Sequence, residues 1–146
     1  MILYRQITTL DIEYSLEKEL RNRVLRLPLG LRLSEEDVRG EDEQVHLVAL
    51  NGQGQVIGCV VVAFSGNVAK VRQLAIEGAY RGRGVGTELM ERAEQAILAR
   101  NVRTVTLHGR VTAQRFFERL SYIADPGVFT EVTIPHIKMH KDLTGG

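Results

Sequence analysis

A turn rich in glycine and arginine, Arg81 to Thr87 (RGRGVGT), separates a β-patterned segment from a strongly amphipathic helical segment. Glycines at alternate positions remove Cβ atoms where the backbone must turn sharply and approach a ligand. The helix that begins there offers unpaired N–H groups that carry roughly half a positive charge. The turn therefore predicts a binding site for an anion such as a phosphate or pyrophosphate.

The segments around this turn predict a β-α-β unit. Apolar residues recur at three- and four-residue spacing after the turn, at Val85, Leu89, Ala93, Ala96 and Ile97. That spacing predicts a helix with one buried face. Val68 to Ile76 before the turn and Val102 to Leu107 after the helix are predicted strands. Because a helix connects them, these two strands are expected to be parallel.

The rest of the chain predicts more strands and one early helix. The sequence predicts a first strand at Ile2 to Ile7. It also predicts a helix that has Asp11 as its N-cap and ends at Pro28 and Gly30. Residues 31–43 are acidic and form either a short helix or a loop. The apolar runs Val45 to Leu50 and Val56 to Phe64 are expected to join Val68 to Ile76 in an antiparallel meander.

Composition narrows the class of protein. The 146 residues fit one domain, predicted over residues 1–143 with a flexible tail at 144–146. The net charge of +1 gives no bulk attraction to nucleic acid or to an anionic membrane, so neither is an expected partner. No apolar run is long enough to span a bilayer, and no signal peptide is recognised, so a cytoplasmic protein is expected. Cys59 lies in an apolar run and is predicted to be a buried thiol, and no histidine spacing predicts a metal site.

The glycine turn matches neither a dinucleotide fingerprint nor a P-loop. Read as R-x-x-G-x-G, with Arg81, Gly84 and Gly86, it resembles the acyl-coenzyme A signature of the GCN5-related N-acetyltransferases; the alternative is an ordinary glycine turn. A second stretch, with Ala113, Phe116 and Phe117, resembles the A-x-x-F-[YF] helix of that family. Residues 129–139 further resemble the C-terminal end of its ElaA-like branch.

This resemblance, which covers residues 45–139, implies a mixed α/β fold whose central, mostly antiparallel sheet is flanked by helices. It also implies an enzyme that binds acetyl-coenzyme A as co-substrate, without a metal, and acetylates a primary amine of a small molecule or peptide by direct attack. An exposed strand edge makes a homodimer an expectation as well. The coenzyme contacts implied are Leu74, Ala75, Ile76, Arg81, Gly82, Arg83, Gly84, Val85, Gly86, Thr87, Phe116 and Phe117.

The chemistry implied by the family needs a base for the amine and benefits from an acid for the departing thiolate. Many relatives place tyrosine where this chain has Phe117, which cannot donate a proton. Either the thiolate leaves without a side-chain acid, or Tyr122 supplies the proton, or turnover is weak. The candidate bases are His108, Glu131 and His136, and also Glu77, each of which has a solvated or purely structural role as the alternative.

Two further alternatives stay open. Phe117 also fits a module that captures acyl-coenzyme A but catalyses little, acting as a sensor, and the same turn could hold another pyrophosphate, such as that of a nucleotide. On the first helix, Arg21 and Arg26 either meet an anionic acceptor or belong to a solvated helix face.

Overall fold

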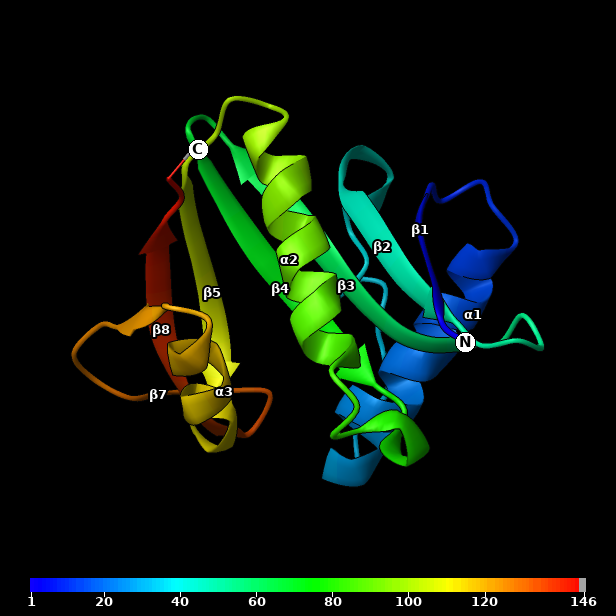
Figure 1. The fold of residues 1–146 in the computed structure, drawn as a ribbon. Helices are drawn as coiled ribbons and strands as arrows, with labels where there is room; N and C mark the ends of the chain where they lie inside the picture. Colours follow the sequence, from blue (N-terminus) through cyan, green and yellow to red (C-terminus); the bar gives the residue numbers. More distant parts are fainter. Residues whose placement is uncertain (145–146) are drawn as a thin grey trace.

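The computed structural model describes residues 1–144, and its strands form one sheet with helices on both faces (Figure 1). The strands are β1 (Leu3–Ile7), β2 (Val45–Leu50), β3 (Val56–Ser65), β4 (Val68–Ile76), β5 (Thr104–Arg110), β6 (Ile123–Ala124), β7 (Phe129–Glu131) and β8 (Ile134–Asp142). The helices are α1 (Glu13–Arg21), continued by the π-helical turn η1 (Asn22–Arg26), α2 (Val85–Leu98) and α3 (Gln114–Arg119). Short 3-10 turns lie at Leu27–Leu29, Glu41–Glu43, Gly78–Tyr80 and Val111–Ala113.

The sheet has the order β1-β2-β3-β4-β5-β8-β6, with β7 paired to β8. The one parallel pair is β4 with β5, across the α2 connection, and every other described pair is antiparallel. This arrangement confirms the predicted meander, the β-α-β unit and the mixed, mostly antiparallel fold class. β1 is an edge strand, and the homodimer expected from an exposed edge stays a prediction.

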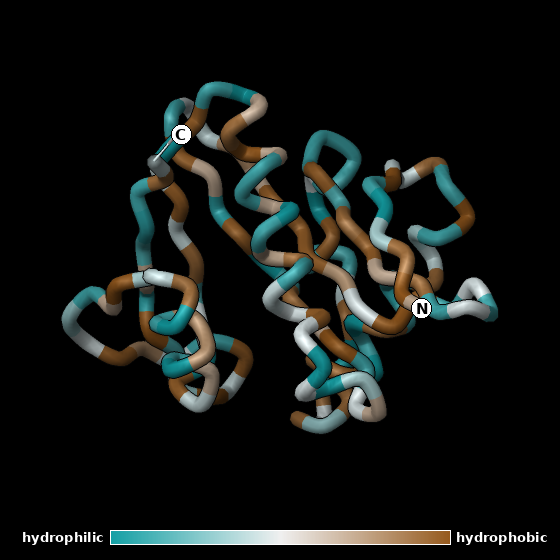
Figure 2. The backbone as a smooth tube through the Cα atoms, viewed as in Figure 1, coloured by the Kyte–Doolittle hydropathy of each residue, from teal (hydrophilic) through white to brown (hydrophobic). Residues whose placement is uncertain are grey.

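Two apolar clusters fill the space on either side of the sheet. The larger lies under α2 and α3 and includes Leu89, Val105 and Met139; the smaller lies under α1 and includes Leu20 and Cys59. Figure 2 shows the hydrophobic residues concentrated along the central strands. Burial raises the pKa of the Cys59 thiol well above its ordinary value, and its Sγ donates to the Gln73 carbonyl at 3.4 Å.

Several boundaries differ from the expectation. Asp11 does not cap α1: its carboxylate accepts the Thr8 N–H at 2.7 Å, and the helix begins at Glu13 without a side-chain cap. The last strand runs on to Asp142, and Leu143 is buried in the larger core. The domain boundaries stay a prediction, and of the expected tail, residues 145–146 lie outside the described residues. In the described part of the chain, no helix is both long and apolar enough to cross a membrane.

A β-bulge in β4 lies where this strand separates from its other neighbour, β5. The register between β3 and β4 shifts between Cys59 and Val61, so that β4 carries one extra residue, and Gln73 takes a positive φ of 57°. β4 pairs with β5 only from Val68 to Val71. Beyond the bulge the two strands diverge toward α3 and the start of α2 (Figure 1). A bulge disrupts the ladder and bends its strand, which here opens the sheet.

A buried ionic cluster supports this bulge from the α1 side. We call Glu17, Arg21, Glu41, His46 and Arg72 the Arg21 cluster. Arg21 binds both carboxylate oxygens of Glu41, at 2.8 and 2.6 Å, and one of Glu17, at 2.8 Å. Its Nε also donates to the Gln73 side chain at 3.2 Å. Arg72 donates to Glu41 at 2.8 Å. The cluster therefore fixes the side chain of the bulge residue and the arginine that precedes it.

His46 completes the cluster with both of its ring nitrogens. Nδ1 lies 3.1 Å from a Glu17 oxygen, and Nε2 lies 2.8 Å from the Glu41 carbonyl oxygen. Both partners are acceptors, so the protonated ring suits the site. Burial by itself would lower the pKa of His46, but the hydrogen bond and charge of Glu17 raise it overall. Burial likewise opposes the charge of Glu41, yet Arg21 and Arg72 hold the pKa of that carboxyl down at about 2.

Glu17, Glu41 and His46 also approach one another closely enough, within 4.8 Å, for a metal site that sequence spacing did not indicate. The guanidinium of Arg21 already occupies their carboxylates. A cation in the same place would face a positive charge that has no room to leave, because Arg21 is fully buried. We therefore interpret the cluster as a structural ion network.

Replacing Arg21 by methionine is expected to lower the free energy of unfolding by about 3–5 kcal/mol, because Glu17 and Glu41 would stay buried without their partner. Arg92→Met is the matched control, since Arg92 also pairs with a glutamate four residues earlier, Glu88, but on the exposed surface. That change is expected to cost at most about 1 kcal/mol. Urea denaturation measures both, and equal losses would contradict a structural role for the cluster.

The raised pKa of His46 predicts a pH-dependent stability. A group whose pKa is higher in the folded state contributes stability that is fully present below its unfolded pKa, near 6.5, and is lost as the pH rises through the folded value. The free energy of unfolding is therefore expected to fall as the pH is raised above about 6.5. In His46→Gln this fall should be smaller. Urea titrations over a pH series test this, and an unchanged slope in the variant would exclude His46 as the cause.

Candidate functional site

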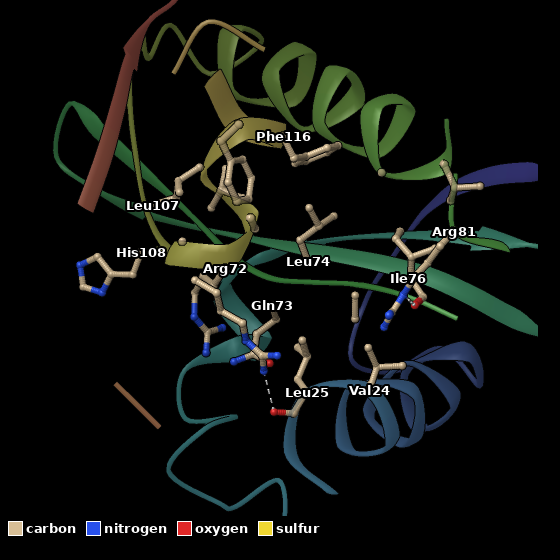
Figure 3. Close-up of a pocket in the computed structure, with 18 of the residues that line it drawn as sticks. Val24, Leu25, Arg72, Gln73, Leu74, Ile76, Arg81, Leu107, His108 and Phe116 are labelled. Carbon is tan, nitrogen blue, oxygen red and sulfur yellow. Dashed lines mark hydrogen bonds between the residues drawn. The ribbon is translucent and has the colours of Figure 1, made fainter. Parts of the chain in front are cut away.

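A cleft of about 630 Å³ opens where β4 and β5 diverge. The bulged half of β4 and the turn before α2 form one wall, and the end of β5 with α3, β7 and β8 forms the other. Figure 3 shows Leu74 and Phe116 on the α2 side of the cleft, and Arg72, Gln73 and Leu25 on the α1 side. The cleft therefore passes through the gap in the sheet and joins its two faces.

The glycine turn forms one end of the cleft. Gly82 and Gly84 have φ values of 76° and 80°, a conformation that residues with a Cβ rarely adopt. Gly84 is the N-cap of α2, and its carbonyl accepts the Glu88 N–H at 3.0 Å as the first bond of the helix. The N–H groups of Val85, Gly86 and Thr87 precede that bond, so they have no partner within the helix. This end can bind an anion through backbone amides alone.

All but one of the expected coenzyme contacts line this cleft. Arg81 lies with them, and its Nε donates to the Ile76 carbonyl at 3.3 Å. The exception is Arg83, whose guanidinium lies over the Tyr80 ring, 5.4 Å from its centre. Arg83 therefore contributes its backbone to the turn and directs its side chain elsewhere.

Unpaired amides of β4 line the middle of the cleft. The Glu77 N–H donates to the Ile57 carbonyl of β3, at 2.8 Å. Backbone amides alternate in direction along a strand, so the amide of Ala75 also points to β3, whereas those of Leu74 and Ile76 point to the side that β5 has left. These two N–H groups can donate to an oxygen bound in the cleft.

Three of the expected catalytic residues meet on the α1 side of the cleft. His108 Nδ1 lies 2.9 Å from one Glu131 oxygen, and His136 Nε2 lies 3.8 Å from the other. The His136 Nδ1 donates to the Ile134 carbonyl at 2.9 Å, which fixes the ring. Phe129 packs edge-on against His108, with ring centres 4.9 Å apart. The end of β5 and the β7–β8 hairpin thus assemble a histidine-carboxylate group from positions far apart in the sequence.

Tyr122 lies outside this group. Its ring is buried, and its hydroxyl donates to Glu94 of α2 at 2.9 Å. Burial, followed by the charge of Glu94, raises the pKa of that hydroxyl. The preceding residue, Ser121, takes a positive φ of 73°, and the chain then directs Tyr122 into the core. Tyr122 does not line the cleft, so it is not placed to protonate a thiolate there.

Phe117 lines the cleft but is almost wholly buried. Its ring fills the space beside Gly109, where an added Cβ would approach it to 3.2 Å. Phe116 lies edge-on to it and faces Gly86 in the same way. The two rings thus shape the α2 side of the cleft without supplying a proton donor.

The arginines of the first helical segment do not behave as expected for an anion site. Arg21 is completely buried in the Arg21 cluster and cannot meet an acceptor. Arg26 lines the cleft but pairs with Asp37 at 3.1 Å. Glu77, the other candidate base, is held at 2.8 Å by Arg23 and does not line the cleft.

Sequence reasoning missed Arg110, which lines the cleft at the end of β5. Its Nη2 donates to the Leu25 carbonyl of η1 at 3.0 Å, the bond drawn as a dashed line in Figure 3. The signal that could have found it was its spacing from His108: residues two apart on a strand share a face.

Comparison with known proteins agrees with this architecture. The family model described as Acetyltransferase (GNAT) domain matches residues 31–143. The uncharacterized protein YyaT of Bacillus subtilis is 25% identical over 129 residues, which cover 82% of this chain and 87% of that protein.

Solved structures extend the likeness over nearly the whole chain. A Lactobacillus plantarum structure assigned as an N-acetyltransferase has a TM-score of 0.87 at 26% identity, covering 98% of this chain and 99% of the other. Escherichia coli ElaA shares the fold, with a TM-score of 0.85 at 19% identity, over 97% of this chain and 100% of its own. The chain therefore belongs to the GNAT acetyltransferase family and is an acyltransferase enzyme.

Proposed function

We propose that this enzyme transfers the acetyl group of acetyl-coenzyme A to a primary amine by direct attack. One observation carries the proposal: a single cleft connects an amide-lined anion site at the glycine turn with the histidine-carboxylate group, past the free amides of the β4 bulge. Two structures of the same fold support the choice of coenzyme. An aminoglycoside 6'-N-acetyltransferase and the PaiA N-acetyltransferase of Thermoplasma acidophilum were each solved with coenzyme A, at TM-scores of 0.73 and 0.71.

In this proposal the coenzyme pyrophosphate binds the backbone of the glycine turn. The amides of Val85, Gly86 and Thr87 and the α2 dipole favour negative charge there. Gly82 and Gly84 allow the turn its left-handed conformation. The thioester end then lies at the bulge, where the amides of Leu74 and Ile76 stabilise the oxygen as it gains negative charge.

His108 is the proposed general base. An alkylamine with a pKa of about 10.4 is mostly protonated at neutral pH, and only its neutral form attacks a thioester. If Glu131 accepts the proton on His108 Nδ1, the lone pair of Nε2 is free for the amine. The carboxylate also stabilises the imidazolium that forms. His136, whose Nδ1 is bound to the Ile134 carbonyl, lies with its Nε2 3.8 Å from the second Glu131 oxygen.

The atoms balance without a side-chain acid. The amine nitrogen bonds to the acetyl carbon, the carbon–sulfur bond breaks, and the amine proton passes to His108 and then to solvent. The coenzyme leaves as its thiolate. Phe117 offers no proton to it, which also keeps a second function open: a domain that binds acyl-coenzyme A as a sensor and turns it over weakly. Measured transfer to an amine separates the two.

Acetyl-coenzyme A is expected to raise the thermal midpoint of the wild-type protein by about 5–10 °C at a hundred times its dissociation constant, which corresponds to about 2.7 kcal/mol. ATP and NAD should give no comparable rise. Gly84→Ala should reduce the rise, because alanine is strained at a φ of 80° even though its Cβ meets no other atom within 4 Å.

Gly78→Ala is the matched control for Gly84→Ala. Gly78 lies in the preceding turn, also has open space for a Cβ, and has no positive φ. It should keep the full rise in midpoint with acetyl-coenzyme A. An equal rise with ATP, or an unaltered rise in Gly84→Ala, would argue against the glycine turn as the coenzyme site.

His108→Gln is expected to lower kcat/KM for the amine by about 10²- to 10⁴-fold, the usual contribution of a general base, while the acetyl-coenzyme A shift remains. His140→Gln is the matched control: His140 Nδ1 also contacts a carboxylate, Asp125, at 2.7 Å, but lies outside the cleft. Steady-state rates over a pH series test the role. A His108→Gln enzyme with a wild-type profile would remove His108 from the mechanism.

A further inference from the structure

Arg110 stands on the same face of the sheet as the proposed catalytic group. It lies directly opposite His136 in the β5–β8 register, and His108 is two residues earlier on the same strand. Residues opposite each other in an antiparallel pair share a face, as do residues two apart on a strand. Arg110 therefore borders the part of the cleft in which an amine would approach His108.

Two other arginines on this side of the cleft have carboxylate partners. Arg26 pairs with Asp37 at 3.1 Å, and Arg72 pairs with Glu41 at 2.8 Å. Within residues 1–144, Arg110 has no carboxylate within 4.0 Å, and its recorded side-chain bond is the one to the Leu25 carbonyl. That bond uses one of five guanidinium N–H donors. Arg81 and Arg119 also line the cleft without an ion pair among these residues, but Arg110 is the half-buried one two residues from His108 on the same strand face.

Its surroundings make this charge costly to leave unpaired. Burial, and then the positive charges of Arg26 and Arg81, lower the pKa of Arg110, although a guanidinium stays protonated in a protein. The nearby Glu131 carboxylate is engaged with His108. An uncharged donor could make the same hydrogen bond to the Leu25 carbonyl, so this bond alone does not explain a guanidinium at position 110. An anion bound in the cleft would explain it.

We propose that the acceptor amine carries an oxyanion group, a carboxylate or a phosphonate-like group, that binds the Arg110 guanidinium; this rests on the proposed acetyl transfer. The planar fork of arginine matches two oxygens of such a group. The acceptor is then bipolar: its amine lies at His108, and its anionic end lies at Arg110. This assigns to Arg110 the anion-binding role that Arg21, buried, and Arg26, paired, do not fill.

The spacing limits the size of the acceptor. Positions 108 and 110 are about 7 Å apart along β5, the rise of two residues in a strand. An amine and an oxyanion that bridge two side chains at this distance need only a short spacer. Small amino acids with one to three carbons between the two groups fit this requirement.

The experiment measures acetyl transfer to four arms of matched amines. The first arm is glycine, β-alanine and 4-aminobutyrate; the second is their primary amides; the third is aminoalkylphosphonates with the same spacers; the fourth is diamines of the same lengths. The wild-type enzyme should give a kcat/KM about 10- to 100-fold higher for an acid than for its amide, as expected for a charge-assisted hydrogen-bonded pair. The third arm identifies which oxyanion is preferred.

Arg110→Gln should bring the acid-to-amide ratio close to one, mainly through KM, and Arg110→Lys should retain part of it because the charge remains without the fork. Arg103→Gln is the matched control, since Arg103 is an exposed arginine just before β5 and outside the cleft. It should keep the wild-type ratio. If Arg110→Gln does not fold, the acid-to-amide ratios of the wild-type enzyme and of Arg110→Lys still test whether Arg110 binds the anionic group.

Other outcomes separate this inference from the proposed function. Transfer only to amides or diamines by the wild-type enzyme overturns the anionic acceptor and leaves amine acetylation standing. A wild-type ratio that persists in Arg110→Gln overturns the role of Arg110. Transfer to none of the arms, in a protein whose midpoint rises with acetyl-coenzyme A, overturns both the acceptor class and the acetylation of small amines.

Discussion

The bidentate pair between Arg21 and Glu41 holds the structural arrangement on which the site depends. It joins α1 to the segment before β2, and through Gln73 and Arg72 it fixes the strand that bends away from β5. Buried ion pairs often add little net stability, because desolvation offsets attraction. Here the cluster contacts the bulged part of β4 directly, through the Gln73 and Arg72 side chains.

This opening gives the two faces of the sheet different chemistry. On the α2 side, the glycine turn, Phe116 and Phe117 form a wall of backbone amides and aromatic rings. On the α1 side, charged and titratable side chains gather, including His108 and Arg110. The bulge lies between them, and its free amides face the passage. In the proposed reaction, the coenzyme would bind on one side of this layer and the acceptor would react on the other.

Local patterns in the sequence predicted much of this fold. The periodicity of α2, the apolar strands and the glycine turn each report on neighbours in the chain, so the β-α-β unit and the meander followed from them. The bulge at Gln73 could not be predicted in that way, since its contacts are with residues far away in the sequence, such as Arg21. The same holds for the meeting of His108 with Glu131 and for the burial of Tyr122 against Glu94. Long-range contacts decided each of these, and no local pattern contains them.

Only four residue pairs, Val68–Thr104 to Val71–Leu107, join the two halves of the sheet. Backbone pairing within each half is antiparallel, so the halves pair with each other only through this short parallel ladder. They also share the larger apolar core under α2 and α3. A change in the width of the gap would therefore alter the packing of that shared core as well as the ladder. A ligand bound in the cleft would contact both halves and link them where β4 and β5 no longer pair. The conformational entropy lost when it orders the two halves would lower its affinity.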